Sequence, residues 1–245
     1  MNATSKFQEE PDRPLSEDET RVIIQNAQVL LQTWRAMPRR AFTHPWERFG
    51  AGCVTRASGT LDSILRLNND AADCATLARS LFEHVVVFAW MAAEPEVRLA
   101  MLLRKNANEV RKTASELIAL RTVTLDSSVI ATADRQSMGE KAPGVADQAL
   151  EADAFWSVRV PGWSWGFRRS YTSMYRPYSM FVHPSSNGMA TLFEPDGSVD
   201  VRRCDAIVGH VRAGAALCFA DGLVVASETL SWPPREHLAG SSTNS

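Results

Sequence analysis

The stretch from Asp70 to Ala93 constrains the fold of this chain more than any other part of it. It is long and mostly apolar, yet it carries Arg79, Glu83 and His84 close together. Large apolar residues recur in it at helical spacing, which predicts a helix with a buried stripe. The stripe consists of Leu77, Leu81, Val85, Phe88 and Met91. We therefore expect the rest of the chain to be built around this helix.

Capping and proline signals predict further helices on both sides of it. Ser16 and Glu19 form a capping-box pattern, a hydroxyl followed three residues later by a carboxylate, and Pro38 ends the helix that begins there. Pro95 begins the longest helix, because proline at the first helical position loses no hydrogen bond. Pro177 is expected to kink a later, aromatic helix. The expected helical segments are residues 16–37, 46–67, 70–93, 95–122, 164–183 and 204–229.

The second of these segments contains three glycines, Gly50, Gly52 and Gly59. Each glycine inside a helix costs about 1 kcal/mol relative to alanine. Apolar spacing near the end of the segment still favours a helix there.

These signals predict an all-α fold, a helical bundle of about five to six helices. A small hairpin or irregular insertion is expected near residues 190–201, where the sequence Pro-Asp-Gly indicates a turn between two short apolar runs.

The predicted domain organisation is simple. Residues 16–231 form one helical domain, and polar tails at residues 1–15 and 232–245 are expected to be disordered. Residues 123–150 are rich in small and polar side chains and are interpreted as a mobile linker.

Charge and composition exclude several classes of function. A formal net charge of -2 gives no strong attraction to DNA or to an anionic membrane. The first residues lack the apolar core of a secretory signal, so we expect a cytoplasmic protein. The cysteines are far apart and form no Cys-x-x-Cys pair, and no histidine has evident co-ligands, so no metal and no cofactor are predicted. The cysteines are Cys53, Cys74, Cys204 and Cys218.

A row of basic residues on the fourth helix has an ordinary explanation. Arg98, Lys105 and Lys112 lie seven residues apart and share one side, which is typical of a phosphate-contacting face. Glu109 and Glu116 fall on the same side, four residues after each lysine, and can neutralise them. We interpret this side as a solvated helix face.

A second polar group lies in the aromatic segment. Tyr171, Tyr175, Ser179 and His183 are spaced by four residues and share one helix face. Hydroxyl and imidazole groups are costly to bury unless they find partners. Arg79 and Glu83 of the central helix could supply those partners.

The sequence from Arg79 to His84 resembles the arginine, four residues, histidine pattern of HEPN-superfamily ribonucleases. The order of helices, the segment Leu-Phe-Glu-His followed by Trp90 and Pro95, and the later Tyr-x-x-x-Ser-x-x-x-His-Pro are similar to a widespread group of bacterial helical proteins. The resemblance covers roughly residues 20 to 230. It implies a HEPN-like protein of a bacterial defence or stress system that engages RNA as a homodimer. The imidazole would handle a proton and the guanidinium would stabilise phosphate charge.

Two other interpretations of the same residues stay open. Arg79 and His84 are about 140° apart on a regular helix, so one chain cannot direct both at one small group. In the structural alternative, Arg79 and Glu83 form a partly buried ion pair that ties the central helix to the Tyr175, Ser179 and His183 face. In the binding alternative, the same polar cluster lines a pocket for a small ligand or nucleotide, with walls of tryptophan. These are Trp90, Trp163 and Trp165.

Overall fold

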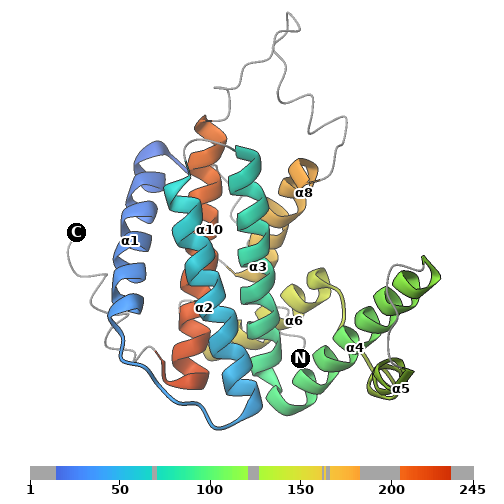
Figure 1. Ribbon diagram of the computed structural model, residues 1–245. Helices are drawn as coiled ribbons and strands as arrows, with labels where there is room; N and C mark the ends of the chain where they lie inside the picture. Colours follow the sequence, from blue (N-terminus) through green and yellow to red (C-terminus); the bar gives the residue numbers. More distant parts are fainter. Residues whose placement is uncertain are drawn as a thin grey trace, which may run out of the picture.

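The computed structural model describes residues 15–67, 71–120, 127–161, 163, 166–182 and 205–232. Within these ranges the protein is all-helical, which confirms the predicted class, and it has more helices than the five or six expected (Figure 1). The helices are α1 Glu17–Ala36, α2 Pro45–Arg66, α3 Ala71–Ala93, α4 Pro95–Ala119, α5 Ser127–Gln136, α6 Val145–Arg159, α7 Phe167–Ser170, the π-helical turn η1 Tyr171–Tyr175, α8 Arg176–Val182 and α10 Asp205–Leu230. The insertion expected near residues 190–201 lies outside the described residues.

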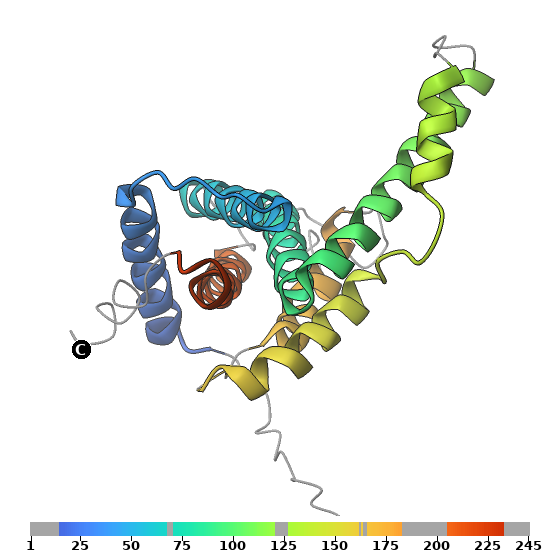
Figure 2. The ribbon, with the colours of Figure 1, turned by 90° about the horizontal axis from the view of Figure 1, so that it is seen from below.

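Helix α3 is the centre of the bundle, as the apolar stretch predicts. It packs against α2 and α10 along one side and against α6, η1 and α8 along the other (Figures 1 and 2). Phe82, Phe88 and Trp90 are almost completely buried. Burial extends around most of its circumference and not along a single stripe, because neighbours cover it on several sides.

The first helices begin where the sequence predicts. The Ser16 N–H donates to Glu19 Oε2 at 2.8 Å and the Glu19 N–H donates to Ser16 Oγ at 3.2 Å, so the capping box is confirmed. At the start of α2, Glu47 accepts hydrogen bonds from the backbone N–H groups of Thr43 and His44. Helices α2 and α4 both have proline in their first turn.

Gly50 allows α2 and α3 to approach closely. A Cβ atom at this position would lie 2.4 Å from the ring of Phe88 on α3. No side chain fits at that distance, so the glycine has a packing reason that offsets its helix propensity.

Helices α4 and α5 form an arm that extends away from the bundle (Figures 1 and 2). Ala107 and Ala114 of α4 and Ala133 of α5 are buried, and Arg111 pairs with Asp134 across the two helices at 3.5 Å. The stretch interpreted as a mobile linker, residues 123–150, contains α5 and the start of α6, two helices that its composition did not predict. A helix this short gains most of its stability from packing on a neighbour, which local composition does not reveal.

The charges of α4 are partly neutralised within the helix, as expected, but through a different pair of residues from the two pairs predicted. Glu109 binds Lys112 at 3.1 Å, and Lys105 donates to the carbonyl of Pro143 at 3.0 Å. Arg98 lies 3.4 Å from Glu151 of α6.

The aromatic segment is continuously helical from Phe167 to Val182. The irregularity expected at Pro177 takes the form of a π-helical turn just before it, in which the Arg176 N–H donates to the carbonyl of Tyr171, five residues earlier. A wider turn relieves the clash that a proline ring makes with the preceding turn of a regular helix.

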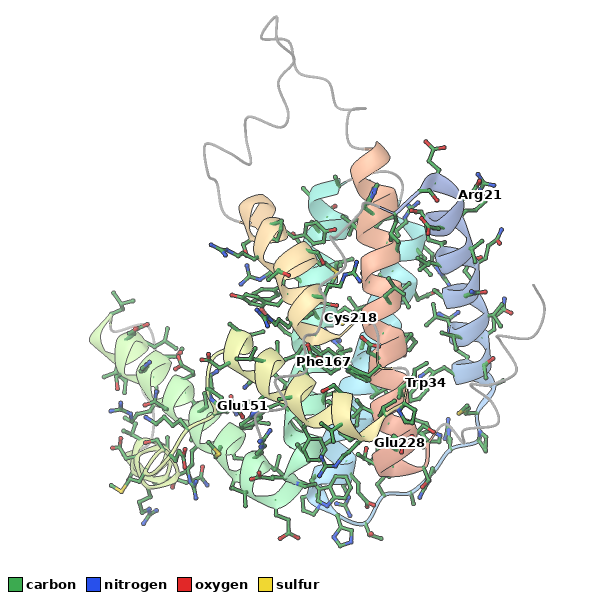
Figure 3. The ribbon with its side chains drawn as sticks, turned by 180° about the vertical axis from the view of Figure 1, so that it is seen from behind. Arg21, Trp34, Glu151, Phe167, Cys218 and Glu228 are labelled. Atoms are coloured by element: carbon green, nitrogen blue, oxygen red, sulfur yellow. The ribbon has the colours of Figure 1, made fainter. Side chains whose placement is uncertain are left out.

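Helix α10 completes the core. Cys218 of α10 and Phe167 of α7 lie in the interior (Figure 3), and both are fully buried. Cys53 and Cys74 are also buried, and no disulfide bond joins these three cysteines.

Two helical segments, Ala71–Ala93 and Val208–Leu230, are long and apolar enough to cross a membrane by length and composition alone. In the most apolar 18 residues of each segment, 61% of the first segment and 67% of the second are buried inside the protein. A core helix meets the same two criteria, so a cytoplasmic location stays a prediction.

Candidate functional site

Four of the predicted site residues meet where α8 and η1 pack on α3: Arg79, Glu83, Tyr175 and Ser179, here called the Arg79 cluster. The Arg79 guanidinium donates from Nη1 to Ser179 Oγ at 2.7 Å and from Nη2 to Tyr175 Oη at 2.8 Å. Its Nε donates to Glu83 Oε1 at 3.4 Å. One arginine therefore connects three elements of the bundle.

The hydroxyl groups of the cluster act as both donors and acceptors. Tyr175 Oη accepts from Arg79 and donates to Glu83 Oε1 at 2.7 Å. Ser179 Oγ accepts from Arg79 and donates to the carbonyl of Tyr175 at 3.0 Å. Both hydroxyl groups therefore have the hydrogen-bond partners that a buried polar group requires.

The tyrosine of the cluster is held in its neutral form. Burial, and next the hydrogen bond to Glu83 and the charge of that carboxylate, raise the pKa of Tyr175 to about 12. At neutral pH this phenol donates a hydrogen bond and does not act as a base.

Aromatic rings enclose the charged group. The Arg79 guanidinium lies 4.3 Å from the centroid of the Tyr175 ring. Phe82 lies 5.1 Å from the same ring, and Tyr171 stacks on it at 5.3 Å. Tyr171 thus joins the site through its ring, and the cation is held against a π face.

His84 lies outside the Arg79 cluster. Its Nδ1 is 2.6 Å from the carbonyl oxygen of Ser80, one turn earlier on α3, so Nδ1 carries the proton and donates it. No contact joins the imidazole to Arg79 within the described residues, as expected from their angular separation on the helix. The structure therefore does not bring the expected catalytic pair together within one chain. His183, the fourth residue of the predicted face, lies outside the described residues.

The tryptophans expected as pocket walls lie elsewhere. Trp90 follows Arg79 by about 16 Å along the helix axis, and its indole N–H donates to Glu151 of α6 at 2.7 Å. The Trp163 indole N–H donates to Asp153 of α6 at 3.1 Å. Trp165 is outside the described residues. The first hydrogen bond joins the end of α3 to α6, and the second joins the segment after α6 back to α6.

Sequence reasoning missed a pair of carboxylates near the start of α7. Asp153 accepts hydrogen bonds from the backbone N–H groups of Phe167 at 2.7 Å and Arg168 at 2.6 Å, and so caps that helix. Asp221 of α10 lies close by, and burial followed by the charge of Asp153 raises its pKa to about 7. No local pattern links two residues so far apart in sequence. In the described part of the chain, no three His, Cys, Asp or Glu side chains gather to hold a metal ion.

The family comparison covers the segment that holds this site. The model of DUF5677, a family of unknown function, matches residues 47–199, which is more than half of the chain. The chain belongs to the DUF5677 family. The match runs from α2 past α8 and includes the whole Arg79 cluster, while α1 and α10 lie outside it. Comparisons with curated proteins and with solved structures give no match.

The DUF5677 assignment supports membership in a family of unknown function. It carries no statement about HEPN ribonucleases or about a bacterial source.

Proposed function

We propose that this DUF5677 protein is a non-catalytic helical scaffold or ligand-binding module in which the Arg79 cluster is structural. One observation carries the proposal: all three nitrogen atoms of the Arg79 guanidinium are hydrogen-bonded to groups of the same chain. A guanidinium that serves substrate phosphate needs free donors directed at the ligand. This one is used to join α3 to η1 and α8.

The energetics of the cluster fit that role. The Arg79 side chain is 23% exposed and the Glu83 side chain 42% exposed, so solvent screens their attraction and the ion pair alone contributes little. The larger effect is the cost of leaving partners unsatisfied. Removal of Arg79 would leave the Tyr175 and Ser179 hydroxyl oxygens without their hydrogen-bond donor. This should lower the free energy of unfolding by about 1–3 kcal/mol.

A HEPN-like ribonuclease of a bacterial defence or stress system is the competing hypothesis. It requires RNA bound near Arg79 and His84 and a homodimer that combines the two residues from different copies. In the folded chain Arg79 is engaged and His84 Nδ1 is bonded to the backbone of its own helix. RNA bound at this place would find three of the five guanidinium N–H groups already used by the cluster.

The two hypotheses predict opposite results for purified wild type, Arg79→Ala and His84→Ala. We expect no RNA cleavage by any of them. Arg79→Ala should lower the melting temperature by several degrees, because it opens the link between α3 and α8, and His84→Ala should lower it less. Arg79→Lys is the matched control: it keeps the charge but not the three-way donor geometry, and should melt between Arg79→Ala and the wild type.

Cleavage by the wild type that both alanine variants lose, at nearly unchanged melting temperature, would overturn the structural proposal. It would also place the active site at Arg79 and His84.

A further inference from the structure

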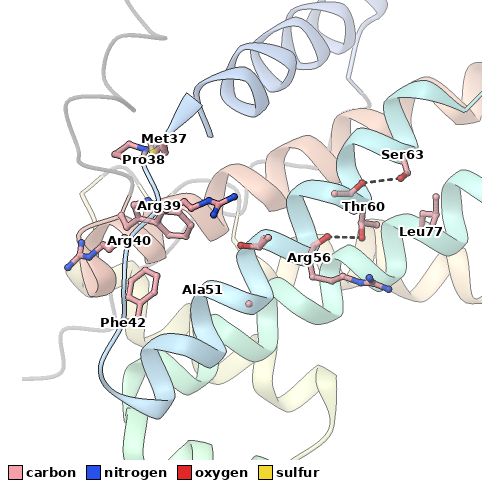
Figure 4. Close-up of a pocket in the computed structure, with 14 residues that line it drawn as sticks. Met37, Pro38, Arg39, Arg40, Phe42, Ala51, Arg56, Thr60, Ser63 and Leu77 are labelled. Atoms are coloured by element: carbon pink, nitrogen blue, oxygen red, sulfur yellow. Dashed lines mark hydrogen bonds between the residues drawn. The ribbon is translucent and has the colours of Figure 1, made fainter. Parts of the chain in front are cut away.

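A hollow of about 960 Å³ lies between the loop of residues 37–42 and helix α2 (Figure 4). Arg39 and Arg40 of the loop line one side of it, and Arg56 of α2 lines another. Trp232, which follows α10, contributes an apolar wall. We call this hollow the arginine pocket.

The arginine pocket has a surplus of positive charge. Three arginines line it, and the described lining residues include no Asp or Glu. Arg40 donates to the carbonyl of Ser231 at 3.0 Å and lies over the Phe42 ring. Arg39 and Arg56 are exposed, and neither guanidinium group forms a hydrogen bond or an ion pair with the described residues. Most other arginines of the bundle are paired, so these two cations are available to a ligand.

The face of α2 that forms the floor of the pocket carries two glycines. Gly52 and Gly59 are two turns apart on α2, and Arg56 lies between them on the same face. A Cβ atom at either glycine would meet no protein atom within 4 Å, whereas one at Gly50 would strike Phe88. Packing therefore explains Gly50 but not Gly52 or Gly59.

Two glycines without a packing reason are costly in the interior of a helix, at about 1 kcal/mol each. Glycine is the residue that lets a ligand approach the backbone closely. At these two positions the backbone of α2 is open to a ligand on either side of Arg56.

We propose that the arginine pocket binds a small ligand with a diphosphate or longer phosphate chain, such as a nucleoside diphosphate. Guanidinium groups match the geometry of phosphate oxygens and can bind them through two parallel hydrogen bonds. The pocket volume lies within the range of small-molecule sites. Phe42 and Trp232 offer apolar surface for the uncharged part of the ligand. This site is separate from the Arg79 cluster. The proposal of a phosphate ligand therefore does not depend on the role proposed for that cluster.

Calorimetric titration of the full chain with pyrophosphate and with ADP tests the proposal, with adenosine as the phosphate-free probe. We expect ADP and pyrophosphate to bind and adenosine not to bind. Arg39→Ala and Arg56→Ala should each weaken binding about tenfold, and added salt should weaken it further. Arg21→Ala removes the same charge at the opposite end of α1 from Trp34 (Figure 3) and should leave affinity unchanged.

The variant Gly59→Ala distinguishes an effect on ligand binding from an effect on folding stability. Alanine at this open helical position should raise the melting temperature, yet its methyl group should weaken binding of ADP and pyrophosphate several-fold. Gly50→Ala is the contrast, because its clash with Phe88 should lower the melting temperature.

The proposal is overturned if neither ADP nor pyrophosphate binds, or if Arg21→Ala weakens binding as much as Arg39→Ala and Arg56→Ala. Wild-type affinity in Gly59→Ala would also contradict a ligand seated on the floor of α2.

Discussion

At the scale of single residues, the neighbours of an ionisable side chain determine whether its charged form is tolerated in the fold. The Arg79 guanidinium is accommodated at a partly buried position because a carboxylate, a phenol and a hydroxyl accept its hydrogen bonds. Asp221 is in the opposite situation, since its Oδ2 is buried and has no hydrogen-bond partner among the described residues. The two residues show how partners, and not burial alone, determine whether a charge is tolerated.

The raised pKa of Asp221 makes folding stability depend on pH. Its pKa rises from 3.8 to about 7 in the fold, because of burial first and the nearby Asp153 second. The folded state keeps the proton up to about pH 7, whereas the unfolded chain loses it near pH 4. The stability contributed by this group is therefore complete below pH 4 and is lost as the pH rises to 7.

Asp221→Asn should remove this loss. We expect the variant to be more stable than the wild type at pH 8, by roughly 4 kcal/mol at most, and the difference to shrink toward pH 4. Chemical denaturation at pH 4, 6 and 8 measures it, with the exposed Asp147→Asn as control. An equal advantage of Asp221→Asn at all three pH values would contradict the assigned ionisation.

At the scale of elements, local signals predicted the starts of helices well, but they did not predict a helix whose stability depends on packing against another helix. Ser16 with Glu19, and Pro95, mark helix starts that the structure reproduces, because caps and prolines act through neighbouring backbone. Helix α5 was missed because its stability comes from α4.

The proposed sites were also predicted only in part. The four-residue spacings in α3 and in the aromatic segment predicted that Arg79 and Glu83 would meet Tyr175 and Ser179, and the structure has these contacts. Spacing also showed that Arg79 and His84 diverge on one helix. The arginine pocket could not be predicted, because it joins a loop to a helix through tertiary packing. The open faces of Gly52 and Gly59 are visible only once the neighbours of α2 are known.

At the scale of the whole molecule, the chain consists of a packed bundle and a projecting arm. Helices α3 and α10 are surrounded by other helices, while α5 packs on α4 (Figure 2). The arm also exposes large apolar side chains, among them Leu103 at 57% and Val110 at 47% exposed. Few buried contacts hold α5 in place, so its local opening should cost less free energy than that of the core.

Hydrogen exchange measured by mass spectrometry should resolve this difference. We expect amides of α3 and α10 to be the most protected, because they exchange only when the whole bundle unfolds, and amides of α5 to exchange many times faster. Arg79→Ala should speed exchange in α8 and in the facing part of α3 while leaving α1 unchanged, because it breaks the hydrogen bond from Arg79 to Ser179 that joins those elements. Protection of α5 equal to that of α3 would show that the arm is fixed by contacts beyond α4. A second copy of the chain covering Leu103 and Val110 would provide them, and the exchange rate of α5 would then fall as protein concentration rises.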